Sequence, residues 1–331
     1  MSGIDVYKQL SKKLMMENSE LLPKIWNFIC DPEEAEILNA LPGTAEELAK
    51  RFKKSTDEMN DSCKSLFHRG AVFDYVRDGK TYYRIPRNIV QFHDASILWP
   101  EAPAELNDLW VEFMNEEFPK LLELVQAVKL PSFMRVLPIN KTIESKNQVL
   151  VHEDAVKLVE NAKTLAVTSC VCRKSIKKCD APIEVCVQLN KGAEYQLKRG
   201  TGRKIDVKEA IEILKISEDA GLVHMTDNRA GKVNAICNCC HCCCQMLIYA
   251  KGEKTKGVTA PSRFQPFLEE ENCNSCGNCI DICPMDAISI KEDNPIAINL
   301  DDCIGCGLCA TTCITDAIYL KQTRPEDFIP L

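Results

Sequence analysis

Aromatic residues make up only 6% of this chain, and its acidic side chains outnumber its basic ones, 48 against 41. Few rings are therefore present to stack on nucleic-acid bases, and the net charge of −7 disfavours a polyanionic partner. No apolar run approaches the roughly 20 residues that cross a bilayer. The first residues, Met1–Asp5, do not have the charged-then-apolar order of a leader peptide. These absences argue against a membrane span and against a nucleic-acid partner, and we expect a cytoplasmic location.

The chain is long for a single domain and rich in cysteine. With 331 residues it exceeds the roughly 100–200 residues of an average domain, so two or three domains are expected. It contains 20 cysteines, and thiols stay reduced in the cytoplasm instead of forming a disulfide network. The cysteines therefore indicate metal ligation.

Eight of the cysteines form two copies of one metal-ligand pattern near the C-terminus. The copies are Cys273-x2-Cys276-x2-Cys279-x3-Cys283-Pro284 and Cys303-x2-Cys306-x2-Cys309-x3-Cys313. A zinc ribbon usually has paired Cys-x-x-Cys knuckles, whereas each copy here offers three ligands from one turn and a fourth from farther along. The spacing therefore predicts two [4Fe–4S] cubanes. Gly277, Gly305 and Gly307 would let loop amides point toward cluster sulfurs.

On this motif, residues 268–320 resemble the bacterial two-cluster ferredoxin domain. In that family the fourth cysteine of each copy ligates the cluster held by the other copy. The resemblance implies one cluster on Cys273, Cys276, Cys279 and Cys313, and a second on Cys303, Cys306, Cys309 and Cys283. It also implies electron transfer between the two cubanes. After each fourth cysteine, Met285–Ile290 and Thr315–Leu320 predict a short helical turn that leads into a strand.

Residues 1–94 are predicted to form helices followed by a hairpin. Capping boxes at Thr44 with Glu47 and at Ser55 with Glu58 each predict the start of a helix. The expected helices are Pro32–Leu41, Ala45–Phe52 and Thr56–Arg69, and the expected strands are Ala71–Val76 and Thr81–Ile85.

This order of helices and hairpin resembles the winged helix-turn-helix fold, so DNA binding is an alternative. Residues 31–94 carry 12 acidic and 10 basic side chains. The third helix opens on Thr56-Asp57-Glu58, where phosphates would require cations. We therefore favour protein docking or dimerisation for the winged-helix-like module.

The centre of the chain holds ten further cysteines. Residues 95–150 are predicted to be a helical connector. A buried strand is expected at Leu165–Ser169, and loops at strand ends commonly carry sites. Four cysteines follow this strand, and six more lie in one short run; the candidate ligands of additional iron–sulfur clusters are Cys170, Cys172, Cys179, Cys186, Cys237, Cys239, Cys240, Cys242, Cys243 and Cys244.

Several arrangements of these ten thiols remain open. Two cubanes would use eight of them, and a pair of five-thiolate clusters would use all ten. A non-cubane cluster, or one cluster with spare thiols, also fits the run at Cys237–Cys244. Arg173 and the lysines near it would favour ionised thiolates. His241 could donate to a cluster sulfur, act as a ligand or have no part in the site.

The chain as a whole is expected to be α+β, with a winged-helix-like domain (1–94), a connector (95–150), a cysteine-rich α/β domain (151–265) and a ferredoxin-like dicluster domain with a tail (266–331). This arrangement resembles the 4Fe–4S dicluster-domain proteins of anaerobic microbes. The leading hypothesis is an electron-transfer protein or subunit that has redox-protein partners and could form a homo-oligomer through its N-terminal module. The alternatives are a reductase, and so an oxidoreductase component, with its active site at the central cysteines, and a redox-responsive DNA-binding regulator.

Overall fold

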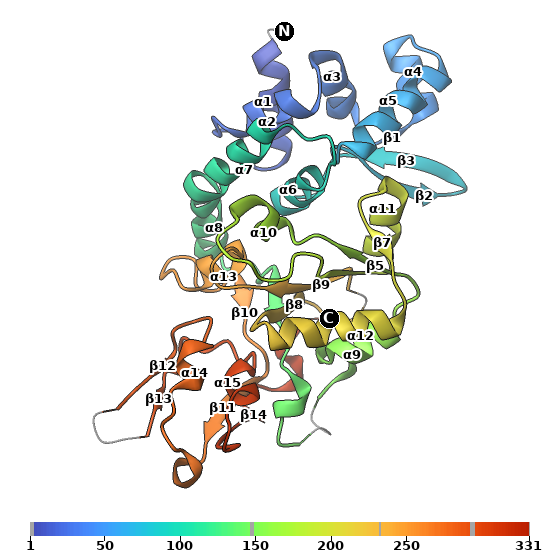
Figure 1. The fold of residues 1–331 in the computed structure, drawn as a ribbon. Coiled ribbons are helices and arrows are strands. Elements are labelled where there is room, and N and C mark those ends of the chain that lie inside the picture. The colour runs from blue at the N-terminus through green and yellow to red at the C-terminus, as the bar shows by residue number, and fades with distance from the viewer. Residues whose placement is uncertain (1–2, 146–148, 232, 292–294, 331) are drawn as a thin grey trace. The chain divides into compact units, whose positions relative to one another are not determined.

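The structure is a computed structural model that describes residues 3–145, 149–231, 233–291 and 295–330 (Figure 1). The chain divides into two compact units, Met1–Leu121 and Leu122–Leu331. Helices and strands are mixed along the chain, as the α+β prediction requires. In the described part of the chain, no helix has the length and apolar character needed to cross a membrane. The finer division into four parts stays a prediction.

The first unit consists of helices and one small sheet. Its helices are α1 (Gly3–Lys13), α2 (Leu22–Ile29), α3 (Pro32–Ala40), α4 (Ala45–Phe52), α5 (Thr56–His68), α6 (Ile89–Ile97) and α7 (Ala104–Glu116). Its strands are β1 (Gly43–Thr44), β2 (Phe73–Arg77) and β3 (Lys80–Arg84), which form an antiparallel sheet in the order β1-β3-β2. Trp26 stacks on Phe92 with ring centroids 3.9 Å apart, and both rings are buried in the core.

Capping explains why α4 and α5 begin at the predicted residues. The Glu47 amide donates to the Thr44 hydroxyl at 3.2 Å, and the Thr44 amide donates to the Glu47 carboxylate at 2.8 Å. Ser55 and Glu58 exchange the same pair of bonds at the start of α5. Each box satisfies two amides that would otherwise have no helical partner. Both predicted helix starts are confirmed.

The second unit is built on a seven-stranded sheet in the order β10-β4-β8-β9-β6-β5-β7. Its strands are β4 (Met134–Val136), β5 (Leu165–Thr168), β6 (Cys186–Leu189), β7 (Arg203–Lys204), β8 (Val223–Asp227), β9 (Ala235–Cys239) and β10 (Thr259–Ala260). The buried strand predicted after residue 164 is confirmed as β5. Every pair is antiparallel except β10 with β4, so the expectation of a central α/β domain is wrong and the sheet is of the α+β kind.

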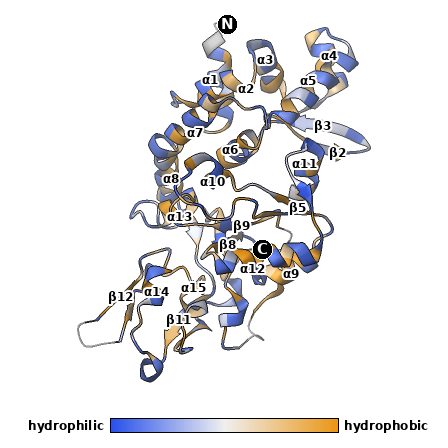
Figure 2. Cartoon of the chain, viewed as in Figure 1, coloured by the Kyte–Doolittle hydropathy of each residue, from blue (hydrophilic) through white to orange (hydrophobic). Residues whose placement is uncertain are grey.

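Helices cover this sheet and close its core. Those that contact its strands are α11 (Lys191–Arg199), α12 (Val207–Asp219) and α13 (Gln245–Ala250). The other helices are α9 (Ala155–Glu160) and α10 (Val171–Ile176), and α8 (Phe118–Ala127) contains residues of both units. The apolar side of α12 packs against α9, β5 and β8 (Figure 2). Residues 95–150 are not purely helical, because β4 belongs to the sheet and forms hydrogen bonds with β8.

The C-terminal part of this unit is made of short elements. They are β11 (Phe264–Leu268), α14 (Asn278–Asp281), β12 (Ile288–Ser289), β13 (Ala297–Ile298), α15 (Leu308–Thr311) and β14 (Ile318–Gln322), together with the 3-10 turns η4 (Glu270–Asn272) and η5 (Glu326–Phe328). The 3-10 turns η1 (Asn140–Thr142) and η3 (Val151–Glu153) lie earlier in the unit. Strand β11 pairs with β14, and β12 pairs with β13. The strands predicted after each fourth cysteine are confirmed. The short helices contain the third cysteine of each copy instead of following the fourth, because only a turn fits between the fourth cysteine and the strand.

Candidate metal centres

Two cavities in the C-terminal part are each lined by four cysteines. The inner cavity encloses about 350 Å³ including its mouth, and its thiols belong to Cys283, Cys303, Cys306 and Cys309. The outer cavity encloses about 300 Å³, and its thiols belong to Cys273, Cys276, Cys279 and Cys313. Each cavity therefore receives three thiols from one copy of the motif and the fourth from the other copy. Four thiols around an open space are the donor set that a cubane requires.

Backbone amides point at the sulfurs of both cavities. The Ala287 amide donates to the Cys283 sulfur at 3.4 Å, and the Ala317 amide donates to the Cys313 sulfur at 3.2 Å. These two bonds occupy the same place in the two copies of the motif. Such donors stabilise negative charge on sulfur and are one means by which a protein raises a cluster's reduction potential.

The two cavities differ in exposure. Cys306 and Cys309 in the inner cavity are each 8% exposed, and burial raises the pKa of Cys306 to about 12. Cys276 in the outer cavity is exposed. Partial burial acts to raise the pKa of Cys313, but hydrogen bonds from Thr315 and nearby amides outweigh it and lower that pKa. The outer cavity thus contains the more exposed thiol.

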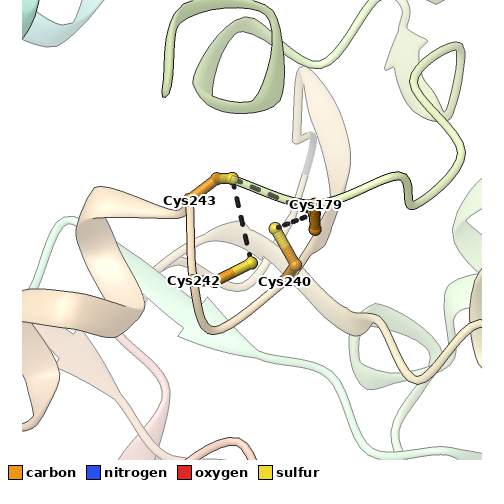
Figure 3. Close-up of side chains that lie close together, drawn as sticks. All are labelled: Cys179, Cys240, Cys242 and Cys243. Carbon is orange, nitrogen blue, oxygen red and sulfur yellow. Dashed lines mark hydrogen bonds between the residues drawn. The ribbon is translucent and has the colours of Figure 1, made fainter. Parts of the chain in front are cut away.

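Four of the central cysteines meet at one point, and we call Cys179, Cys240, Cys242 and Cys243 the central quartet (Figure 3). Their sulfurs all lie within 4.8 Å of one another. The Cys179 sulfur is 3.7 Å from that of Cys240 and 3.9 Å from that of Cys243. Cys242 and Cys243 are separated by 3.8 Å. Among the described residues, no other set of three or more histidine, cysteine or acidic side chains gathers its ligand atoms as tightly.

The other central cysteines form a connected series, which we call the six-thiol group: Cys170, Cys172, Cys186, Cys237, Cys239 and Cys244. The sulfurs of Cys186 and Cys237 are 4.0 Å apart. Hydrogen bonds with the Cys172 and Cys239 thiols lower the pKa of Cys244. The ten candidate ligands are therefore brought together as a group of four and a group of six, which differs from an equal division into fives. Their role as ligands stays a prediction.

Strand geometry and helix starts explain this division. Cys237 and Cys239 are two residues apart on β9 and point to the same face of the sheet. Cys239 and Cys244 belong to one apolar cluster, whereas Cys240 and Cys243 belong to another. Cys170 and Cys244 each occupy the residue that precedes a helix, α10 and α13.

A polar network supports the run of cysteines, and two of its members, His224 and Asn238, were not expected from the sequence. His224 on β8 lies 2.6 Å from the Asn238 side-chain oxygen, and the Asn238 amide donates to the Val185 carbonyl at 2.6 Å. Arg173, 3% exposed, donates to the Asn238 carbonyl at 2.9 Å. Burial acts to raise the pKa of Cys240, but hydrogen bonds from Arg173, the Cys243 amide and the Cys242 thiol together outweigh it and hold that pKa at about 7. The available signal was a histidine between two apolar residues, Val223 and Met225.

The side chain of His241 is exposed and is not part of the central quartet. Between the two cysteine runs, the side chain of Arg203 on β7 forms two ion pairs. Arg203 pairs with Glu184 at 3.1 Å and with Glu209 at 2.7 Å.

Comparison with known proteins supports the assignment of the C-terminal part. A family model described as a 4Fe-4S dicluster domain matches residues 272–317. The chain thus has a C-terminal ferredoxin-type dicluster domain, and the match covers both cysteine motifs. No curated protein and no solved structure matches the chain. The remainder of the chain therefore has to be interpreted from its own residues.

Proposed function

We propose that this chain is an iron–sulfur electron-transfer protein, or the electron-transferring subunit of a larger assembly, in which two C-terminal [4Fe–4S] clusters connect a redox partner to a central cysteine centre. The observation that carries the proposal is the pair of four-cysteine cavities inside the matched dicluster segment. Cubanes bound there would exchange single electrons. The protein's own residues supply ligands, amide donors and burial.

The residues around the two cavities favour different tasks. The outer cavity has an exposed cysteine and is suited to a docking partner. The inner cavity is lined by apolar side chains, including Met285, Ile304 and Leu320, which would exclude water. Low polarity and few water contacts around a cluster affect its potential. The two sites are therefore expected to have different potentials.

The inner cavity lies against the six-thiol group. Cys306, Met285 and Ile304 share one apolar cluster with Cys239 and Cys244. The Ile139 amide, which follows β4, donates to the Cys306 carbonyl at 3.1 Å and ties the loop to the central sheet. This packing supports the six-thiol group as the central centre that exchanges electrons with the inner cavity.

Iron and sulfide analysis of anaerobically purified protein, with electron paramagnetic resonance after reduction, tests the proposal. The expected result is about eight irons per chain in the C-terminal domain, with signals of two interacting [4Fe–4S] clusters. Replacing Cys276 and Cys306 by serine in separate variants should remove the signal of the outer or the inner cluster, respectively. A reconstituted protein that stays colourless and free of iron would refute the proposal.

A reductase is the second candidate function, and the observation that favours it is the Cys186–Cys237 pair, with sulfurs 4.0 Å apart and both residues partly exposed. A disulfide or another small molecule reduced here would take its electrons from the C-terminal clusters. Reduced protein should then be reoxidised when such a compound is added, and a Cys186→Ser variant should be reoxidised much more slowly. If a screen of disulfides and small electron acceptors finds none that reoxidises the protein, this role is removed.

We infer that α3–α5 and the β1–β3 sheet form a winged-helix-type module that docks a protein. The order of elements supports this fold. The charge at the start of α5 disfavours DNA, because Asp57 and Glu58 lie in its first turn. Lys54, just before it, already pairs with Glu33 at 2.5 Å. A gel-shift titration with the anaerobic protein distinguishes the two roles, since salt-sensitive DNA binding would instead favour the regulator hypothesis.

A further inference from the structure

The sulfur separations of the central quartet match the geometry of one metal ion. A tetrahedral zinc ion has Zn–S bonds of about 2.3 Å, which places pairs of its sulfur ligands about 3.8 Å apart. Three of the six sulfur separations in the quartet are 3.7, 3.8 and 3.9 Å, and the other three are within 4.8 Å. We propose that the central quartet binds a single divalent metal ion through four thiolates, and that it is not the site of an iron–sulfur cluster.

The same separations exclude a cubane between these sulfurs. The four thiolates of a cubane bind four different irons and radiate outward from its corners. They therefore lie much farther apart than thiolates that share one ion. The two C-terminal sets each line a cavity, whereas the four quartet sulfurs stand within 4.8 Å of one another, as the ligands of a single ion do.

The four ligands come from two separate segments of the chain and leave no open position on the ion. Three come from the turn between β9 and α13, and the fourth, Cys179, comes from the loop after α10 (Figure 3). No nitrogen or oxygen ligand lies in the quartet, and four thiolates with no open position are typical of structural sites. The ion would hold the loop that leads to β6 against the turn that leads to α13.

Residues outside the quartet fit the negative charge of a tetrathiolate centre. A divalent ion with four thiolates carries a net charge of about −2. The buried guanidinium of Arg173 is hydrogen bonded to Cys240. The Lys178 amide donates to Cys243, and the Cys243 amide donates to Cys240. Hydrogen bonds to ligand sulfurs of this kind orient them and stabilise their charge.

Zinc is the ion we expect. Soft thiolates bind both zinc and iron, and the divalent affinity order places zinc above ferrous iron at such a site. Zinc does not change oxidation state, so it would fix the fold without taking part in electron transfer. The inference deepens the proposed function, because it leaves the six-thiol group as the part of the centre that can exchange electrons.

Metal analysis of the full-length protein tests this site separately from the C-terminal clusters. We expect about one zinc per chain in addition to the cluster iron, and a zinc absorption-edge spectrum with four sulfurs at about 2.3 Å and no neighbouring metal. This spectrum is measured on the unaltered protein, so it does not depend on any variant folding. If the proposed C-terminal clusters are absent, the protein would lack iron, and the zinc signal would be unchanged.

A pair of neighbouring substitutions gives the matched control. Cys242→Ser removes one quartet ligand, and His241→Ala changes the exposed residue beside it. The first should lose the zinc and keep the cluster iron, and the second should keep both metals. A single non-cluster iron lost with Cys242→Ser would support the one-ion site with iron in place of zinc. Loss of about four irons with Cys242→Ser, or unaltered protein without a metal at these sulfurs, would overturn the inference.

Discussion

The guanidinium of Arg263 and the carboxylate of Glu153 form a bidentate ion pair in which both side chains are almost fully buried. Nε and Nη2 of Arg263 donate to the two carboxylate oxygens at 2.8 and 2.7 Å, and the side chains are 0% and 1% exposed. Glu153 ends η3, and Arg263 immediately precedes β11. The pair therefore fastens the start of the ferredoxin-type domain to the central part of the same unit.

Breaking this pair should destabilise the second unit strongly. In Glu153→Gln, Arg263 keeps its charge in an apolar site without a compensating carboxylate, and we expect a loss of about 3–5 kcal/mol in the free energy of unfolding. Urea unfolding under anaerobic conditions, followed by circular dichroism, measures this. The exposed pair of Lys256 with Asp302 is the control, because Asp302→Asn should cost less than about 1 kcal/mol. Equal effects of the two substitutions would contradict the prediction.

Two glycines in the cysteine loops should respond differently to alanine. Gly305 and Gly277 both have positive φ, +66° and +81°. A Cβ at Gly305 would overlap the Phe264 carbonyl and lie 2.5 Å from the Ser262 hydroxyl, whereas a Cβ at Gly277 meets nothing within 4 Å. Gly277→Ala should therefore cost only the backbone strain of about 1 kcal/mol, and Gly305→Ala should cost several times more.

The readout for this pair is cluster content together with stability. We expect Gly277→Ala to retain both clusters after anaerobic reconstitution. Gly305→Ala should lose the inner cluster first, because the clash lies in the loop between Cys303 and Cys306. Equal iron content and equal unfolding midpoints in the two variants would show that the loop shifts to accommodate the side chain.

The sequence predicted those features that depend on residues close together in the chain. Thr44 and Ser55 cap helices at the expected positions, because a capping box needs only four consecutive residues. The two cysteine motifs line two cavities for a similar reason, since three of the four thiols come from one loop.

The grouping of the central thiols could not be predicted in this way. Cys239 and Cys240 are adjacent in sequence yet belong to different groups, and the partners that decide this, β8 and β6, are set by the pairing of the whole sheet. Cys179 meets Cys240 across 61 residues. The role of β4 in the sheet was missed because its three residues are too few to show a strand period.

Arg173 should determine how firmly the central quartet holds the zinc ion proposed there. Arg173→Gln removes a buried positive charge beside Cys240, so we expect zinc to be released to a chelator about 10–100 times faster. Lys178→Gln is the matched control: it removes the same charge from an exposed side chain, and the amide that donates to Cys243 stays in place. Release is followed with a chromogenic chelator under anaerobic conditions. Equal release rates in the two variants would assign the effect to overall charge.

Glu218 should make the second unit sensitive to acid. Burial acts to raise the pKa of this carboxyl, but hydrogen bonds from His224 and Lys141, the latter at 2.7 Å, outweigh it and lower the pKa below 4.5. The carboxylate then contributes stability that is complete above the pKa of the unfolded chain and is lost as the pH falls through the folded value. Glu218→Gln should therefore be less stable than the unaltered protein at pH 7, and this difference should shrink as the pH is lowered through 4.5. Urea unfolding of both proteins at each pH measures this difference in stability directly. Any loss of clusters in acid would affect both proteins equally and would therefore cancel from the difference. Glu160→Gln, at an exposed pair with Lys157, should show little difference at any pH, and a difference for Glu218→Gln that grows on acidification would contradict the assignment.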